Sequence, residues 1–267
     1  MKEELPADVG ALVRAVQGLC IYDLLAEPFY GVKLPPERAS EIHLRTPQAM
    51  LARIRDLDPR PLSRPRPPGK RLAARCGGFT MLLVALLREK GFRARARAGF
   101  GAYFNPPYFE DHWVCEYWKA DEARWAMADA QFDEVWREKM SIRHDILDVP
   151  REQFLVAGEA WRRCRSGAAD PEKFGIAFVP LRGLWFVAAS LVRDAAALAG
   201  VQTLPWDVWG AMPRAPRALT DEELALFDRL AAGDEDQMKT LYATEEHLRV
   251  PPRVFNAILN RPEAIPA

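Results

Sequence analysis

Hydrophobic residues recur at helical spacing in two segments near the start of the chain. The first predicts an amphipathic helix over residues 8–26 from the positions Val9, Leu12, Val13, Val16, Leu19 and Cys20. A second helix is predicted from about Thr46, a suitable N-cap, to Leu57. Residues 59–69 then contain five prolines, which exclude both a helix and a central strand. The sequence therefore predicts a helical region over 1–58 that ends in a stiff loop.

After Arg75 the pattern changes to one helix followed by three strands. Residues 76–90 carry an apolar face at helical spacing, formed by Phe79, Leu82, Leu83, Leu86 and Leu87. Gly91 is suited to end this helix. Residues 92–100 alternate strictly, with alanine and phenylalanine on one side and three arginines on the other, as in a strand. Two further strands are predicted over 111–119 and 124–130, with a turn at 120–122.

The rest of the chain reads as mainly helical. The Thr220-Asp-Glu-Glu223 segment resembles a capping box before a helix that reaches about Ala232. Further helices are predicted over 150–163, 181–198, 235–243 and 251–259. The expected fold is α+β, with a small antiparallel sheet packed on the helix that begins at Cys76. We expect a single domain over 1–267, with a core at about 70–135 between N-terminal helices and a helical extension at about 150–262.

Net charge, apolar runs and cysteine spacing argue against several classes of partner and site. Lysine plus arginine equals aspartate plus glutamate at 37 each, so no global charge favours a nucleic acid or a membrane as partner. No apolar run approaches the roughly 18 residues of a membrane helix, and the polar start Met1-Lys2-Glu3-Glu4 is unlike a signal peptide. These features predict a soluble cytoplasmic protein. The four cysteines form no CxxC pair, which argues against a zinc site and a disulfide scaffold. We expect neither a cofactor nor a metal.

Cys76 is the first candidate for chemistry because it opens a predicted helix. The free N–H groups and the positive dipole end of a helix favour an anion, so this thiol should ionise readily. Between Asp58 and Glu89 the sequence has no acidic residue but seven basic ones, which are Arg60, Arg64, Arg66, Lys70, Arg71, Arg75 and Arg88. Gly77 and Gly78 are expected to leave the backbone open to a substrate. The basic segment is either a solvated loop or a feature that attracts an anionic substrate.

His112 and Asp129 are the second and third candidates. His112 opens the second predicted strand and Asp129 closes the third, so hairpin pairing would bring them to the same end of the sheet. A histidine oriented by a carboxylate is the base that a nucleophilic thiol needs. Asp133 and Asp111 are the alternative carboxylates if the hairpin register differs. The remaining cysteines and histidines lack such neighbours and are expected to be structural.

These residues together resemble the transglutaminase-like superfamily of cysteine enzymes. The resemblance is carried over about residues 70–135 by Arg75-Cys76, Gly91-Phe-Arg-Ala94-Arg95, Asp111-His112-Trp113 and Trp125-Ala-Met-Ala-Asp129. Residues 183–210, with LVRDAAAL and LPWDVWG, look more loosely like the helical extension of bacterial members. The sequence departs from the family pattern at Ala130 and Arg93, where proline is common, and at Trp113, where the aromatic residue is often one position later.

The resemblance implies a papain- or transglutaminase-like core and a catalytic triad of Cys76, His112 and Asp129. Cys76 would attack an amide, ester or thioester carbonyl, and His112 would move the proton. The Cys76 backbone N–H would hold the oxyanion together with a second donor, either near Arg71 to Arg75 or Tyr103. Side chains expected to contact the substrate are those of Arg75, Tyr103, Asp111, Trp113 and Gln131.

The resemblance favours a cysteine hydrolase (an amidase or peptidase) or an amide-forming acyltransferase. Its substrate would be small or peptidyl, with an anionic or carrier-bound molecule as one interpretation of the basic segment. The alternative is a binding or scaffolding module that keeps the fold without turnover. A zinc site formed by the same triad is a third, minor hypothesis. Trp206 and Trp209 either pack in the core or line the pocket, with Arg193 and Asp207 facing the substrate or each other.

Overall fold

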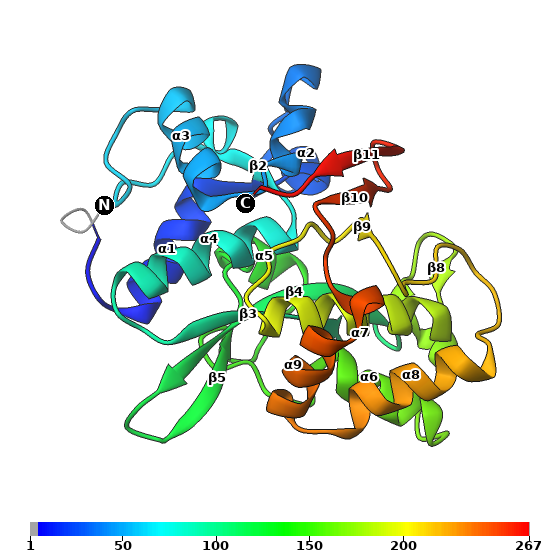
Figure 1. Cartoon of the computed structure of the whole chain (residues 1–267). Coiled ribbons are helices and arrows are strands. Elements are labelled where there is room, and N and C mark those ends of the chain that lie inside the picture. Colours follow the sequence, from blue (N-terminus) through cyan, green and yellow to red (C-terminus); the bar gives the residue numbers. More distant parts are fainter. Residues whose placement is uncertain (1–4, 267) are drawn as a thin grey trace. The chain divides into compact units, whose positions relative to one another are not determined.

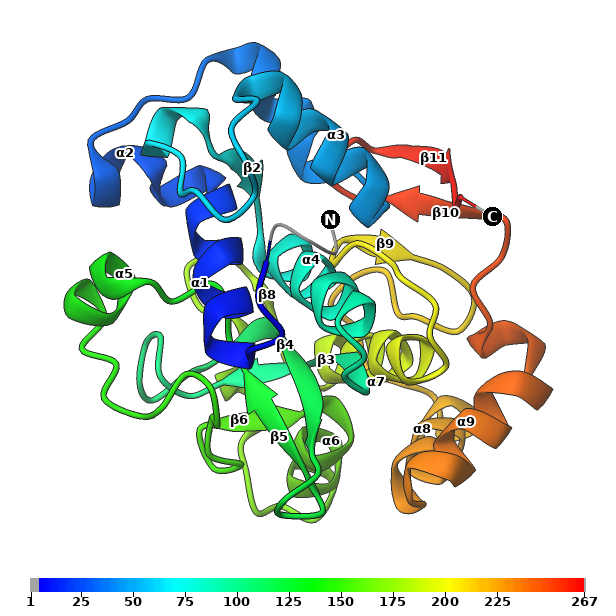
Figure 2. The same ribbon diagram turned by 90° about the vertical axis from the view of Figure 1, so that its left-hand side faces the viewer.

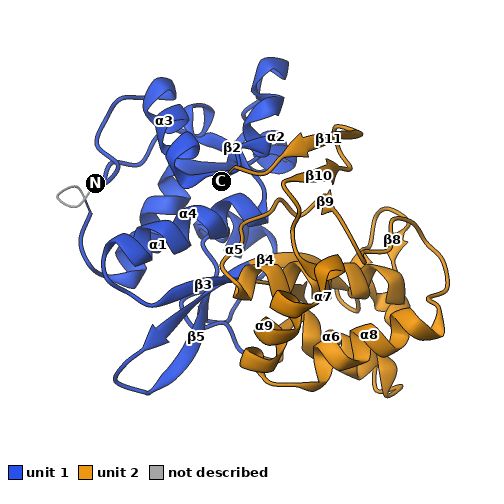
Figure 3. Ribbon diagram, viewed as in Figure 1, with its two compact units in different colours: residues 1–96, 114–150 blue, residues 97–113, 151–267 orange. Residues whose placement is uncertain are grey.

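The computed structural model describes residues 5–266 and has an α+β fold, as predicted. The chain forms two compact units (Figure 3). Unit 1 contains residues 1–96 and 114–150, and unit 2 contains residues 97–113 and 151–267. Two strands, β3 (Ala94–Gly101) and β4 (Phe109–Lys119), contribute residues to both units. Among the residues described, no helix is long and apolar enough to cross a membrane.

The largest sheet contains β3 and β4. Its strand order is β6-β3-β4-β7-β8, with β5 (Arg124–Ala128) paired to β4. The β4–β5 hairpin is antiparallel, as predicted, and it sets Cys115 opposite Ala128, whereas β4 pairs with β7 (Phe174–Ile176) in parallel. The sheet is therefore mixed rather than antiparallel. Strands β6 (Phe154–Val156), β7 and β8 (Leu181–Arg182) were not predicted, because strands of two or three residues are too short to show alternation.

The N-terminal part of unit 1 differs from the predicted single helix. Helix α1 (Val9–Leu19) begins after an Asp8 N-cap, and the chain then forms β1 (Cys20–Tyr22) and a short 3-10 helix, η1 (Asp23–Leu25). Helix α2 (Ala26–Tyr30) and a second 3-10 helix, η2 (Pro36–His43), follow. The prediction for 8–26 was wrong after Leu19 because β1 pairs in parallel with β2 (Leu72–Ala74), a partner about fifty positions away. Tertiary pairing here overrides the local pattern.

The other predicted elements of unit 1 are confirmed. Helix α3 (Pro47–Leu57) starts at the expected Thr46 N-cap, and the proline-rich loop forms no helix or strand before η3 (Pro68–Lys70). Helix α4 (Cys76–Glu89) follows β2, and α5 (Glu134–Lys139) follows β5. Helix α4 packs against α1 and α3, as Figures 1 and 2 both show. Its buried leucines, Leu82, Leu83, Leu86 and Leu87, contribute about 1.5–3 kcal/mol each to the unit 1 core.

Unit 2 is built around helix α7 (Leu184–Leu198), which is buried along almost its whole length. Helices α6 (Ala157–Arg165), α8 (Asp221–Ala232) and α9 (Glu235–Thr244) pack with it, as Figure 1 shows. The Thr220 capping box is present at the start of α8. The unit also contains η4 (Pro171–Lys173) and η5 (Glu246–Leu248). The helices predicted at 181–198, after Thr220 and at 235–243 are confirmed within a few residues at their ends.

Two predicted helices of unit 2 were wrong in part or entirely. Residues 150–163 form β6 before α6, and residues 251–259 form β10 (Arg253–Asn256) and a turn. Strand β10 is the centre of a small sheet with β9 (Asp207–Val208) and β11 (Arg261–Ala264). Asn256 fixes this turn, because its side-chain oxygen accepts hydrogen bonds from the backbone N–H groups of Ile258 and Leu259. In such a turn the side-chain oxygen accepts the hydrogen bonds that backbone carbonyl oxygens would accept in a helix.

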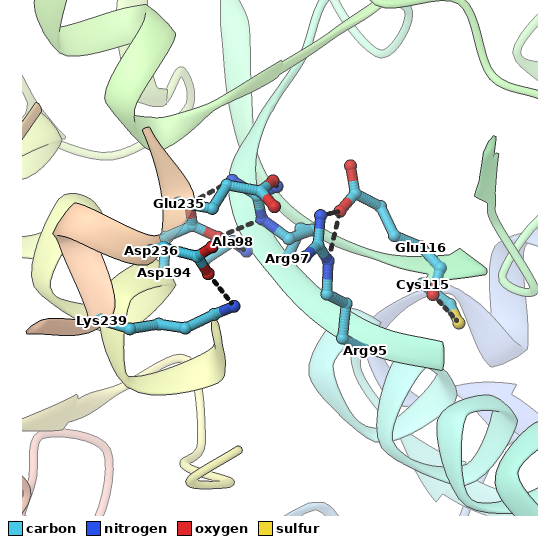
Figure 4. Close-up of polar contacts among 9 residues, drawn as sticks. All are labelled: Arg95, Arg97, Ala98, Cys115, Glu116, Asp194, Glu235, Asp236 and Lys239. Atoms are coloured by element: carbon cyan, nitrogen blue, oxygen red, sulfur yellow. Dashed lines mark hydrogen bonds and ion pairs between the residues drawn. The ribbon is translucent and has the colours of Figure 1, made fainter. Parts of the chain in front are cut away.

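The arginines of β3 do not face solvent, although the alternating pattern suggested a polar face. In unit 1, Arg95 pairs with the fully buried Glu116, and its guanidinium lies 3.9 Å from the centre of the Trp125 ring. In unit 2, Arg97 is 3 % exposed and donates two hydrogen bonds to the carboxylate of Asp194 on α7 (Figure 4). Both faces of β3 are therefore covered, and each buried cation has a carboxylate partner.

Candidate functional site

Cys76 is the first residue of α4, as predicted, and its side chain is 7 % exposed. The N-cap residue Arg75 makes no side-chain capping bond, and the first turn contains no acidic residue. The dipole end of α4 therefore favours a negative charge at this position. A Cβ atom at Gly78 would lie 3.2 Å from the Cβ atom of Ala74, so this glycine allows α4 to approach β2 closely.

The other three cysteines are held as thiols. Burial raises the pKa of Cys20 to about 12, with Arg71 opposing the rise, and burial also raises the pKa of Cys164 to about 12. The pKa of Cys115 is raised well above its usual range by burial and by the neighbouring Glu116 carboxylate. A thiol with so high a pKa is protonated at neutral pH and is a poor nucleophile. The structural role of these three residues stays a prediction.

The basic segment before Cys76 is largely engaged in structural contacts. The guanidinium of Arg66 is buried and donates to the carbonyl oxygens of Pro61, Arg64, Asp58 and Arg60, which holds the proline-rich loop together. Arg71 pairs with Asp133. Arg75 binds Asp23 through both nitrogens of its guanidinium edge, at 3.0 and 3.1 Å. Arg71 and Arg75 therefore have carboxylate partners that come from distant parts of the unit 1 sequence.

Asp129 lies immediately after β5 and is 2 % exposed. Its Oδ1 atom accepts a hydrogen bond from the backbone N–H of Gln131 at 3.0 Å, and its own N–H donates to Ile146. The alternative carboxylate, Asp133, is already used: it caps α5 and accepts a hydrogen bond from the Tyr30 hydroxyl. Of these two carboxylates, Asp129 is the better orienting group for a base.

His144 is a neighbour of Asp129 that the sequence did not single out. Burial lowers the pKa of His144, and the negative charge of Asp129 partly offsets that shift. Gln131, a predicted substrate contact, is buried, and its Oε1 atom has no hydrogen-bond partner. His144 lies in the irregular segment after α5, where no periodicity could have linked it to Asp129.

His112 belongs to unit 2 and is the fourth residue of β4, not its first. The imidazole is buried among aromatic rings, with centroid distances of 4.8 Å to Phe104, 6.1 Å to Tyr103 and 6.2 Å to Phe154. Tyr103 and Trp113, two predicted substrate contacts, are also buried. Rings on several sides restrict the orientation of the imidazole.

Asp111 adjoins His112 on β4 and faces α7. Burial raises the pKa of Asp111 to about 6, against the opposing charges of Arg193 and His112 and a contact with Ser190. A carboxyl group whose pKa is shifted toward neutrality is typical of a functional site, although structural networks also produce such shifts. The guanidinium of Arg193 donates to the backbone carbonyl oxygen of Asp207.

The predicted site residues thus fall into two groups. Unit 1 holds Cys76, Arg75, Asp129 and Gln131, and unit 2 holds Tyr103, Asp111, His112 and Trp113. Between residues 5 and 266, no group of three histidine, cysteine or acidic side chains is arranged to hold a metal ion. Trp209 is buried in the unit 2 core, where its indole N–H donates to the Leu248 carbonyl.

Comparison with known proteins finds no matching protein-family model, no matching curated protein and no matching solved structure.

Proposed function

We propose that this protein is a transglutaminase-like cysteine enzyme that performs acyl transfer at an amide, ester or thioester carbonyl. The observation that carries the proposal is the position of Cys76 at the first residue of α4, in a chain whose other three thiols have raised pKa values. The substrate would be a small or peptidyl acyl donor, and the acceptor would be water or an amine.

The roles of His112 and Asp129 in the proposal rest on the family resemblance and on their places along the chain. His112 is the fourth residue of β4, and Asp129 directly follows β5, the strand that pairs with β4. A base and its orienting carboxylate are expected from neighbouring segments of this kind.

In the proposed reaction the Cys76 sulfur attacks the carbonyl carbon, and the thiol proton passes to His112. The bond from that carbon to the leaving nitrogen, oxygen or sulfur breaks, and the leaving group takes the proton from the imidazole. Water or an amine then attacks the thioester, and the thiol is restored. Asp129 would hold the imidazole tautomer, and the Cys76 backbone N–H would donate to the oxyanion. A positively charged substrate pocket is not part of the proposal, because Arg71 and Arg75 are paired with carboxylates.

The test is the accumulation of an acyl adduct. The full-length chain would be incubated with p-nitrophenyl acetate and analysed by intact mass and peptide mapping. An acetyl group on Cys76 that is absent from Cys76→Ala is the expected result, and Cys164→Ala, a half-buried thiol outside the site, is the matched control. His112→Ala should slow adduct formation by about 10²–10⁴-fold, which is the range for loss of a general base.

The competing hypothesis is a binding module that keeps the fold without turnover. It predicts that iodoacetamide at near-neutral pH labels Cys76 no faster than Cys164, and that no thioester forms. Equal labelling rates together with an absent adduct would reject the enzyme. Rapid and selective labelling of Cys76 would reject the binding module.

A further inference from the structure

Unit 2 contains a group of buried polar atoms with no partners, which we call the buried polar centre. It consists of Asp111 on β4 and of Ser190 and Arg193 on α7. Ser190 is 0 % and Arg193 is 6 % exposed. Asp111 Oδ1, Ser190 Oγ and Arg193 Nη1 are each buried without a hydrogen-bond partner of normal geometry. The Ser190 hydroxyl lies close enough to the Asp111 carboxyl to lower its pKa, so the two residues share one environment. Three unsatisfied atoms on residues that interact electrostatically are unusual, since native structures leave few buried polar atoms unpaired.

The guanidinium of Arg193 is held on one side only. Its Nε and Nη2 atoms lie 3.4 and 3.3 Å from the carbonyl oxygen of Asp207. The Asp207 carboxylate in turn accepts a hydrogen bond from the Leu204 N–H at 2.8 Å. These contacts fix the direction of Arg193 and leave Nη1 as a donor that is not used within the chain.

The centre offers one donor, one acceptor and one group that can be either. Arg193 Nη1 donates, Asp111 Oδ1 accepts when ionised, and the Ser190 hydroxyl does both. With a pKa of about 6, Asp111 is mostly ionised at pH 7.5. An unmade bond to a buried group is unfavourable, so a ligand that completes all three would gain more than tenfold in affinity.

We propose that the buried polar centre is a subsite that recognises a neutral amide, such as a carboxamide or a peptide unit. The carbonyl oxygen of an amide would accept from Arg193 Nη1 or Ser190 Oγ, and its N–H would donate to Asp111 Oδ1. A carboxylate would be opposed by the charge of Asp111, and an ammonium group would be opposed by Arg193. Only a group that has both a donor and an acceptor, and no net charge, suits both ends of the centre.

In a catalytic role this subsite rests on the proposed function. It would bind a second amide group of the acyl donor, one that does not react. The centre adjoins His112, because Asp111 directly precedes that histidine on β4. Binding energy from such a remote group would position the reacting carbonyl. The binding property itself needs no chemistry at Cys76.

The experiment is an NMR titration of the full-length, ¹⁵N-labelled chain at pH 7.5. The probes are acetamide, acetate and methylammonium, which are similar in size and differ in charge. We expect saturable shifts at Ser190 and at the Arg193 Nε–H with acetamide, and binding of acetate and methylammonium at least about tenfold weaker. Ser190→Ala and Asp111→Leu should each weaken acetamide binding by about three- to tenfold, whereas Ser166→Ala on the exposed end of α6 should not change it.

The spectrum of each variant also reports whether the variant is folded. Tighter binding of acetate than of acetamide would replace the amide subsite with an anion site. The absence of a saturable shift with any probe would mean that water alone fills the centre, and that result also overturns the proposal. Two results together separate the two proposals. If Cys76→Ala still binds acetamide and the wild type forms no acyl adduct, the enzyme is rejected and the subsite is kept.

Discussion

Replacing Asp194 by asparagine removes the charge that compensates a buried arginine in unit 2. Asp194 is 0 % exposed, and its carboxylate accepts from Arg97 Nε at 2.9 Å, from Arg97 Nη2 at 2.8 Å and from the backbone N–H of Ala98 at 2.9 Å (Figure 4). Asparagine keeps the shape but has a single acceptor oxygen and turns an NH₂ group toward the guanidinium. The variant therefore leaves a buried cation that is poorly paired.

Breaking a buried ion pair from one side costs about 3–5 kcal/mol. Here the lower end applies, because Glu235 still contacts Arg97 Nη1 at 2.9 Å and is partly exposed. We expect Asp194→Asn to lose about 3 kcal/mol of unfolding free energy. The matched control is Glu245→Gln, which makes the same change of charge in the exposed pair with Arg229 and should cost at most about 1 kcal/mol.

The assay is urea unfolding of the full-length chain at neutral pH, with amide hydrogen exchange of Ala98 as the local readout. A second variant, Arg97→Leu with Asp194→Leu, removes both charges and should recover most of the loss. The reasoning is refuted if Asp194→Asn and Glu245→Gln shift the free energy equally at unchanged m-value and Ala98 exchanges no faster than in the wild type.

Three further predictions concern single residues. The Asp111 carboxyl has a folded pKa of about 6 and an unfolded value near 3.8, so its stabilising effect is complete below about pH 4 and is lost as the pH rises through 6. Urea unfolding should therefore show Asp111→Asn gaining about 2–2.5 kcal/mol relative to wild type between pH 4 and pH 7, and an equal difference at both pH values would contradict the assignment. Arg66→Lys should cost about 2–3 kcal/mol, measured by thermal unfolding, because lysine cannot span the four carbonyls that the guanidinium binds; a wild-type Tm would show that the loop does not need it. Gly175→Ala should lower the free energy of unfolding by more than about 2 kcal/mol, since φ is +147° there and a Cβ would lie 2.2 Å from the Leu181 carbonyl oxygen. Gly200→Ala, at φ +83° with nothing within 4 Å of a Cβ, should cost about 1–2 kcal/mol. Similar losses for the two variants would contradict the steric argument.

The long periodic elements could be predicted because each contains several turns or alternations of pattern. Helices α3, α4 and α8 each begin within a few residues of a capping or helix-start signal in the sequence. The short strands could not be predicted. A three-residue strand such as β1 is defined by its pairing with β2, and no local pattern encodes a partner about fifty positions away.

The residues of the candidate site were likewise predictable only where their signals are local in the sequence. The sequence identified Cys76 at a helix start and His112 and Asp129 on adjacent strands, because helix and hairpin signals are local. It left the basic segment before Cys76 open between a solvated loop and a feature that attracts an anionic substrate, and the structure pairs Arg71 and Arg75 with Asp133 and Asp23. It also left His144 without a partner, although that histidine senses the charge of Asp129.

The sequence by itself determined the periods of the main helices and strands and the start of α4 at Cys76. Tertiary structure alone decided where the charges go. The arginines of β3 became buried because Glu116 and Asp194 lie at distant positions that folding brings into contact. The buried polar centre likewise exists only because β4 and α7 pack together. Periodicity follows from backbone geometry and is local, whereas burial and ion pairing depend on which distant residue occupies the other side of the contact.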